Sequence, residues 1–410
     1  MKWPQKKLGQ VADFLLGKML DEKKNKGEFR PYLANVNVRW GRFELGSLRE
    51  MRFELHEHER YGLQFGDIVM CEGGEPGRCA IWKNQAPGMM FQKALHRIRP
   101  AAELDVGFLY YSFLNRGKNG GFDQYCTGST IKHLPRQNLA MVEVEVPPLT
   151  IQKQIASILS AYDNLIENNT RRIEILEEMA RRLYEEWFVK FRFPGHEEVE
   201  FKESELGLIP ESWDLVPLGD IYRTGSGGTP SRKNPGFFGG DYRWVKTKEL
   251  QDRPVFDTEE KISEEGLQKS SAKLFPRNTV LIAMYGATIG RLGLLLEESA
   301  TNQACCAVLP NSQGCGWGYA YLSLFSRRQA LIDLRAGAAQ QNISQDVIKK
   351  FKLLRASDEL HEQFEMVVTP FLTLCFTLYR KNANLRAQRD LLLPKLISGE
   401  IDVSDITMPT

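Results

Sequence analysis

The stretch IQKQIASILSAYDNLIENNTRRIEILEEMARRLYEEWFVKFRF, residues 151–193, decides the architecture of the chain. It contains neither glycine nor proline, and its apolar residues recur at steps of three and four, which is typical of one stripe along a long α-helix. At 1.5 Å per residue such a helix is roughly 55–60 Å long. Seven basic and seven acidic residues balance each other, so we expect this helix to pack on protein and not on phosphate.

A second stretch of the same kind lies near the end of the chain. Residues 359–400, ELHEQFEMVVTPFLTLCFTLYRKNANLRAQRDLLLPKLISGE, carry a seven-residue apolar repeat that is typical of a coiled-coil seam. Moving this stretch back by 209 positions places Leu385 on Leu176, and the same offset aligns 337–356 with 128–147. The sequence therefore predicts a duplicated globule-and-helix pair, with two ordinary long core helices as the alternative. The expected helix seam comprises Ile155, Ile158, Tyr162, Ile173, Leu176, Leu183, Trp187, Phe364, Val367, Phe371, Leu374, Leu378, Leu385 and Leu392.

The order of these stretches predicts an α+β chain with six segments. Short alternating runs separated by turn residues predict a small, mostly antiparallel β core with helices at its edges in each globule. Val106 to Arg116 is expected to form a buried helix, and Pro370 is expected to kink the second long helix. The predicted segments are a first globule (1–148), a long helix (149–193), an exposed polar connector (194–212), a second globule (213–356), a second long helix (357–403) and a tail (404–410).

Composition restricts the class of protein. The chain has 410 residues, 42% of them hydrophobic, and a net charge of +2. A protein that binds DNA alone is usually more basic, so local patches or a partner would have to supply many phosphate contacts. The sequence has no apolar run long enough to span a membrane and no apolar signal sequence at its start, so we expect a cytoplasmic protein. Seven scattered cysteines without a C-x-x-C pair indicate reduced thiols and no metal site.

The sequence contains no motif that indicates an active site. No P-loop pattern occurs, and the glycine-rich GSGGT (225–229) does not lie between a clear strand and a helix, as a nucleotide site requires. The HEH triplet (56–58) is not H-E-x-x-H, and the E-x-K spacing at 22–24 lacks an acidic partner on a preceding strand. An Asn/Asp-Pro-Pro-aromatic tetrapeptide of amino-methyltransferases is also missing. We therefore predict neither a catalytic residue nor a bound cofactor on this chain.

The loops do contain side chains that can read DNA bases. Arginine and lysine recognise guanine, and asparagine and glutamine recognise adenine, where a groove accepts them. For any one of these residues, a solvated loop position is the simpler interpretation. The candidates in the first globule are Lys24, Lys26, Arg30, Asn35, Asn37, Arg39, Arg42 and Arg78. Those in the second globule are Thr229, Ser231, Arg232, Lys233, Lys246, Lys248, Tyr285, Thr288, Arg291, Gln340, Gln341 and Asn342.

Several long motifs resemble the specificity (S) subunit of type I restriction-modification systems. SGGTPSRKNPGFFGGDYRWVKTKEL (226–250), YGATIGRLGLL (285–295) and TNQACCAVLP (301–310) are similar to the second target-recognition domain of that family. The stretches 147–191 and 385–403 are similar to its two conserved long helices. The chain departs from the family pattern at Pro370 and at the loosely matching helix-opening residues 361–363.

The resemblance implies a non-catalytic subunit that reads double-stranded DNA. Each globule would recognise one half of an asymmetric bipartite site. The helices would pack antiparallel in a pseudo-twofold repeat, set the spacing of the half-sites and dock two modification (methyltransferase) subunits. S-adenosylmethionine, ATP and Mg would belong to the modification and restriction subunits. The alternatives are a helical adaptor that presents two protein-binding, β-rich modules and a self-contained restriction enzyme. The absence of catalytic motifs argues against the enzyme.

Overall fold

The computed structural model describes residues 3–21, 25–311, 315–334 and 342–406. The chain forms two compact units. Unit 1 combines Met1–Glu167 with Ala383–Thr410, and unit 2 is Asn168–Asn382. Among the described residues, no helix is both long enough and apolar enough to cross a membrane.

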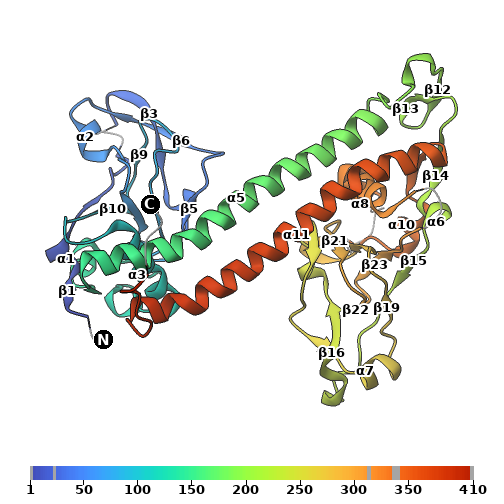
Figure 1. Cartoon of the computed structure of the whole chain (residues 1–410). Helices are drawn as coiled ribbons and strands as arrows, with labels where there is room; N and C mark the ends of the chain where they lie inside the picture. Colours follow the sequence, from blue (N-terminus) through green and yellow to red (C-terminus); the bar gives the residue numbers. More distant parts are fainter. Residues whose placement is uncertain (1–2, 22–24, 312–314, 335–341, 407–410) are drawn as a thin grey trace. The chain divides into compact units, whose positions relative to one another are not determined.

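Two helices of 40 residues each run through both units (Figure 1): α5 (Leu149–Phe188) and α11 (Asp358–Ile397). The sequence determines their ends. α5 begins directly after a Pro-Pro pair, and α11 ends before Gly399, whose φ of +73° favours glycine. α11 continues as one helix through Pro370, which lies on an exposed side of the helix, so the expected kink does not interrupt it. There the carbonyl that loses its N–H partner can be hydrated.

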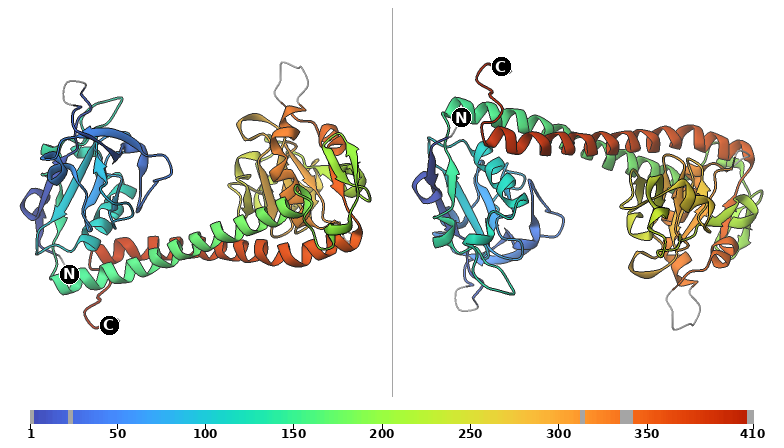
Figure 2. Two further views of the ribbon diagram at one scale, coloured as in Figure 1. Left: turned by 90° about the horizontal axis from the view of Figure 1, so that it is seen from above. Right: turned by 90° about the horizontal axis from the view of Figure 1, so that it is seen from below.

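Unit 1 is built on small sheets beside the start of α5 and the end of α11 (Figure 2). Four antiparallel strands form the order β2-β10-β7-β8, and a second sheet has the order β6-β3-β9. The strands are β1 (Gln5–Lys7), β2 (Ala12–Leu16), β3 (Glu28–Leu33), β4 (Val38–Arg39), β5 (Arg42–Phe43), β6 (Arg49–Phe53), β7 (Ile68–Cys71), β8 (Cys79–Ile81), β9 (Met90–Phe91), β10 (Leu95–Pro100) and β11 (Glu143–Glu145). The short helices are α1 (Leu8–Val11), α2 (Glu57–Tyr61), α3 (Val106–Lys118) and α4 (Arg136–Leu139). The expected buried helix is therefore confirmed as α3.

Unit 2 has a five-stranded sheet, β15-β23-β20-β21-β17, and a four-stranded sheet, β18-β16-β22-β19. The strands are β12 (Phe201–Ser204), β13 (Gly207–Pro210), β14 (Asp214–Pro217), β15 (Thr224–Ser226), β16 (Phe238–Val245), β17 (Arg253–Val255), β18 (Lys261–Ile262), β19 (Leu274–Phe275), β20 (Val280–Ala283), β21 (Leu292–Leu295), β22 (Ser299–Thr301), β23 (Cys305–Val308) and β24 (Lys352–Arg355). The short helices are α6 (Leu218–Ile221), α7 (Glu264–Gln268), α8 (Trp317–Ser326), α9 (Arg328–Asp333) and α10 (Gln345–Lys350). The stretch expected to be a connector contains the β12–β13 hairpin.

The two units repeat one plan, as the sequence offset predicts. β1 pairs with β11 before α5, and β14 pairs with β24 before α11. In unit 1 the Leu8 N–H donates to the Val142 carbonyl at 2.8 Å, and in unit 2 the Leu218 N–H donates to the Phe351 carbonyl at the same distance. Gly9 lies against Ala140, as Gly219 lies against Lys349. Equivalent contacts at equivalent positions confirm the duplicated fold.

Within each unit the long helices pack antiparallel. In unit 1 the α5 side chain of Asp163 accepts from Arg389 of α11. In unit 2 Asn169 Nδ2 donates to Asn382 Oδ1 at 2.9 Å, and the sulfur of Cys375 lies 3.8 Å from the Ile173 carbonyl. As the residue number rises along α5, its partner's number falls along α11, so the antiparallel expectation is confirmed.

The predicted seam requires a correction on α11. Val367 and Leu374 are 42% and 39% exposed, whereas Val368 and Leu372 are buried in the core of unit 2. A seven-residue coiled-coil phase fails here because α11 packs on the globule as well as on α5, so the buried stripe is wider and follows the 3.6-residue turn. Of the other predicted seam residues, Ile155, Ile173, Trp187, Phe364 and Leu378 are buried, and Ile158, Tyr162, Leu176, Leu183, Phe371, Leu385 and Leu392 are partly exposed.

Candidate nucleic-acid interface

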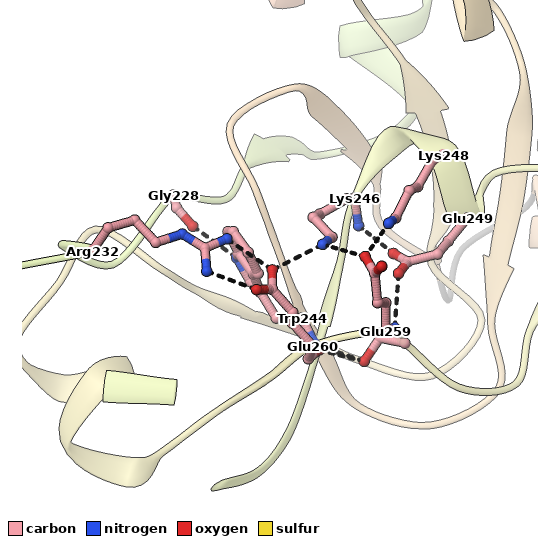
Figure 3. A network of polar contacts seen from close by, with 9 residues as sticks. Gly228, Arg232, Trp244, Lys246, Lys248, Glu249, Glu259 and Glu260 are labelled. Carbon is pink, nitrogen blue, oxygen red and sulfur yellow. Dashed lines mark hydrogen bonds and ion pairs between the residues drawn. The ribbon is translucent and has the colours of Figure 1, made fainter. Parts of the chain in front are cut away.

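A network of charged side chains covers one loop region of unit 2 (Figure 3). Arg232 comes from the glycine-rich loop after β15, and Lys246 directly follows β16. Lys248 belongs to the 3-10 turn Thr247–Glu249, while Glu259 and Glu260 lie between β17 and β18. The sequence predicted the three cations as candidates, and the structure brings them together around carboxylates from a different loop.

The two glutamates hold the cations in fixed positions. Both terminal nitrogens of Arg232 donate to Glu260, at 2.7 and 2.8 Å. Lys246 Nζ donates to Glu259 at 2.9 Å and to Glu260 at 2.8 Å, and Lys248 donates to Glu259. The neighbouring Glu249 accepts the backbone N–H groups of Lys246 and Glu259 and thereby ties the two loops together.

Two aromatic rings lie close to Arg232. Its guanidinium lies 4.3 Å from the ring centre of Phe238 and 5.4 Å from that of Trp244. The Trp244 indole N–H donates to the Gly228 carbonyl at 3.0 Å. At Gly228 a Cβ would overlap Ser271, so glycine is required for this close approach. The Arg232 side chain is nevertheless 56% exposed, so it remains accessible to solvent.

The electrostatics of this network follow from the ion pairs. The Arg232 hydrogen bonds, followed by those of Lys246, lower the pKa of Glu260 to about 2. The Lys246 hydrogen bond, followed by that of Lys248, lowers the pKa of Glu259. Both glutamates are therefore ionised at neutral pH. With Glu249, three carboxylates balance three cations, so this network of six side chains is dense in donors and acceptors but has no net charge.

The other candidates in the second globule are dispersed. Arg291 pairs with Asp252, which also binds Arg328, so it belongs to a separate cluster. The Thr229 hydroxyl lies 2.5 Å from Gln303 Oε1, and Tyr285 is exposed. Ser231, Lys233 and Asn342 are exposed and Thr288 is partly buried, whereas Gln340 and Gln341 lie outside the described residues.

In the first globule most candidates are also ion-paired or internally bonded. Arg39 forms a two-pronged pair with Glu44, and Arg42, whose side chain is 70% exposed, lies 3.9 Å from the same carboxylate. Arg78 pairs with Glu75 and donates to the Asn35 carbonyl. Arg30 pairs with Glu28, Lys26 is exposed, and Lys24 lies outside the described residues.

The prediction that Asn37 reads a base is wrong. It is buried, accepts the Ala34 N–H and donates to the Glu44 carbonyl, both at 2.9 Å. It therefore closes the turn before β4 and cannot reach a base. Sequence reasoning also missed the carboxylates Glu259 and Glu260 and the supporting Trp244, because a search restricted to base-reading residue types overlooks the groups that hold them.

One cluster has ligand types suited to a metal. Glu54, His56 and Glu57 offer atoms within 4.8 Å of one another. Glu57, however, already accepts from the buried Lys18 and from the Glu54 N–H at 2.9 Å. The Lys18 ammonium group already pairs with the Glu57 carboxylate that a metal ion would need.

The chain contains two globules of one plan, and each is joined to a long helix. The loops of both globules carry cationic side chains that are held by hydrogen bonds. These features are typical of a duplicated recognition protein. Residues 1–178 and 210–354 match the family described as the type I restriction modification DNA specificity domain, and the chain belongs to this family. It is accordingly a DNA-recognition subunit, and catalysis in such systems is carried out by partner subunits.

Individual relatives agree with this assignment. The chain is 25% identical over 346 residues to the type I restriction enzyme MjaIX specificity subunit of Methanocaldococcus jannaschii, covering 83% of this chain and 79% of the relative. It is 23% identical over 350 residues to the HindI specificity subunit of Haemophilus influenzae, covering 71% and 74%. The S subunit from M. genitalium has the same fold, with a TM-score of 0.66, 16% identity and coverage of 97% and 96%.

Proposed function

We propose that each globule reads one half of a bipartite DNA site, and that α5 and α11 set the half-site spacing and dock the partner subunits. The main support is the duplication: two units share contacts at equivalent positions, yet their loops carry different side chains. Because the charged loops of the globules differ, the combined site is asymmetric.

The chemistry belongs to partners. Two modification subunits would supply S-adenosylmethionine and adenine methylation, and restriction subunits would supply ATP- and Mg-dependent translocation and cleavage. We place this assembly in the cytoplasm, where its DNA substrate lies. The neutral charge of the Arg232 network supports a division of labour, since much of the phosphate binding would then fall to the partners.

A globule exchange tests this function. Replacing residues 213–356, which end before α11 begins, with the equivalent globule of a relative should change one half-site and preserve the other. The readout is the methylome of a host that expresses the full complex. A methylome in which both half-sites change, or neither, would contradict independent reading.

The adaptor alternative has a separate test. If the globules bind protein only, the complex with the modification subunits will not retard a duplex that carries the methylated sequence. Retardation that depends on this sequence supports DNA recognition.

A further inference from the structure

The neutral Arg232 network is organised differently from a phosphate-binding patch. A phosphate-binding surface presents excess positive charge, because its affinity comes from releasing counterions. Here Arg232, Lys246 and Lys248 are matched by Glu249, Glu259 and Glu260. DNA phosphates that approach this loop meet the exposed carboxylate of Glu259 and the partly exposed one of Glu260 as well as the cations.

We propose that this network is a base-reading element of the second globule: Arg232 binds guanine of a G·C pair in the major groove, and Glu259 and Glu260 withhold the cations from phosphates. The inference rests on the proposed function. Arginine binds guanine O6 and N7 through two donors, and a glutamate accepts from the N4 amino group of cytosine. Both residue types therefore suit the two bases of one pair.

Arg232 is preorganised for this role. Its guanidinium lies against the rings of Phe238 and Trp244, and Glu260 fixes its direction through two hydrogen bonds. A guanidinium held in this way loses little further rotational freedom when it meets a base. Its exposed fraction leaves donors accessible to a ligand.

The glutamates add discrimination rather than affinity. Lys246 is only 18% exposed and is held by two carboxylates, so it orders the loop more than it attracts DNA. A phosphate of non-cognate DNA that approaches Arg232 also meets the negative charge of Glu259 and Glu260, so it gains little from the network. Cognate DNA offers base edges that satisfy the exposed donors and acceptors together. Specificity thus arises because wrong sequences leave these groups unpaired.

The test uses the assembled complex with the modification subunits and fluorescent duplexes. One duplex carries the methylated sequence, and the other carries a changed second half-site. Arg232→Gln should weaken cognate binding by about 5- to 150-fold, relax the sequence at one G·C position of the second half-site and leave the salt dependence unchanged. The control Arg277→Gln removes an exposed arginine from outside the network and should change none of these.

A second variant addresses the carboxylates and guards against a misfolded Arg232 variant. Glu260→Gln should strengthen non-cognate binding, lower the cognate-to-non-cognate ratio and steepen the slope of log affinity against log salt by about one. The control is Glu265→Gln, which makes the same charge change in an ion pair on α7, and it should preserve the ratio. Urea unfolding midpoints verify that all four variants are folded.

The outcomes separate the inference from the proposed function. If Arg232→Gln weakens both duplexes equally and reduces the salt slope by about one, Arg232 binds phosphate and the inference is wrong. If Glu260→Gln weakens non-cognate binding, the carboxylate serves only to order the loop. If the globule exchange alters the second half-site while Arg232→Gln does not, only the inference fails. If the exchange alters nothing, the proposed function itself fails.

Discussion

Buried His361 should make unit 2 sensitive to acid. The residue lies on the first turn of α11 and is 0% exposed. Its Nε2 accepts the Ala356 N–H at 3.2 Å, whereas Nδ1 is buried without a partner among the described residues. Its ring stacks on Phe188 and meets the edge of Tyr319. Because Nε2 accepts the Ala356 N–H, the neutral ring carries its proton on Nδ1. A second proton would go on Nε2, where it would break the bond to Ala356 and place a charge in an aromatic site.

The size of the stability loss at low pH follows from the linkage between protonation and folding. Burial, helped by Arg355 and opposed by Asp358, lowers the pKa of His361 from 6.5 to about 4. The unfolded chain therefore binds the proton first as pH falls, and stability is lost between pH 6.5 and pH 4. The full loss is about 3 kcal/mol, of which about 2 kcal/mol falls between pH 7.5 and pH 5. Above about pH 7.5 this residue contributes almost no pH dependence.

His361→Gln should remove this acid sensitivity. The equivalent position of the first helix, 209 residues earlier, is Gln152, which bonds to three backbone groups, so glutamine suits the start of this helix. The variant loses aromatic contacts and is expected to be less stable at pH 7.5. Its deficit relative to wild type should shrink by about 2 kcal/mol at pH 5.

Urea unfolding between pH 5 and pH 7.5 measures the difference. Tryptophan fluorescence reports the relevant core, since Trp213 lies 5.4 Å from Phe188 between ring centres. His96 is also buried and Glu365 is partly buried. Burial lowers the pKa of His96 and raises that of Glu365, but both residues are present in both proteins, so their effects cancel. His56→Gln, at an exposed position, is the control. Parallel pH curves for wild type and His361→Gln would refute the reasoning.

Three further predictions concern the helices. In urea unfolding, Leu393→Ala at a fully buried position should lower the free energy of unfolding by about 2–5 kcal/mol, whereas Leu391→Ala at a 70% exposed position should lower it by under about 1 kcal/mol. Equal losses would mean that the buried face of α11 is misassigned. Glu365 caps α8 by accepting backbone N–H groups at the start of that helix, so Glu365→Ala should lower the free energy of unfolding by about 1–3 kcal/mol, whereas the exposed control Glu362→Ala should change it little. Similar melting temperatures for the two variants would exclude the cap. Inserting four residues into both α5 and α11 at the unit boundary lengthens each helix by about 6 Å, so the methylome should show half-sites separated by about one or two more base pairs. An unchanged separation would contradict the role of helix length.

The sequence alone determined the long helices and the duplication. Both depend on local or periodic information: an uninterrupted apolar spacing for α5, and an offset that aligns Leu385 with Leu176. The family resemblance was readable for the same reason, since its motifs are continuous stretches of chain. The absence of a catalytic motif likewise required no coordinates to notice.

Only the tertiary structure decided which side chains meet. Whether Val367 or Val368 enters the core depends on the globule against which α11 packs, and no helical period records that surface. Arg232 and Glu260 are 28 positions apart, and their pairing requires two loops to be placed side by side. The sequence could name the cations of the candidate site, but not the carboxylates that hold them, because ion pairs between loops are formed by folding and leave no local pattern.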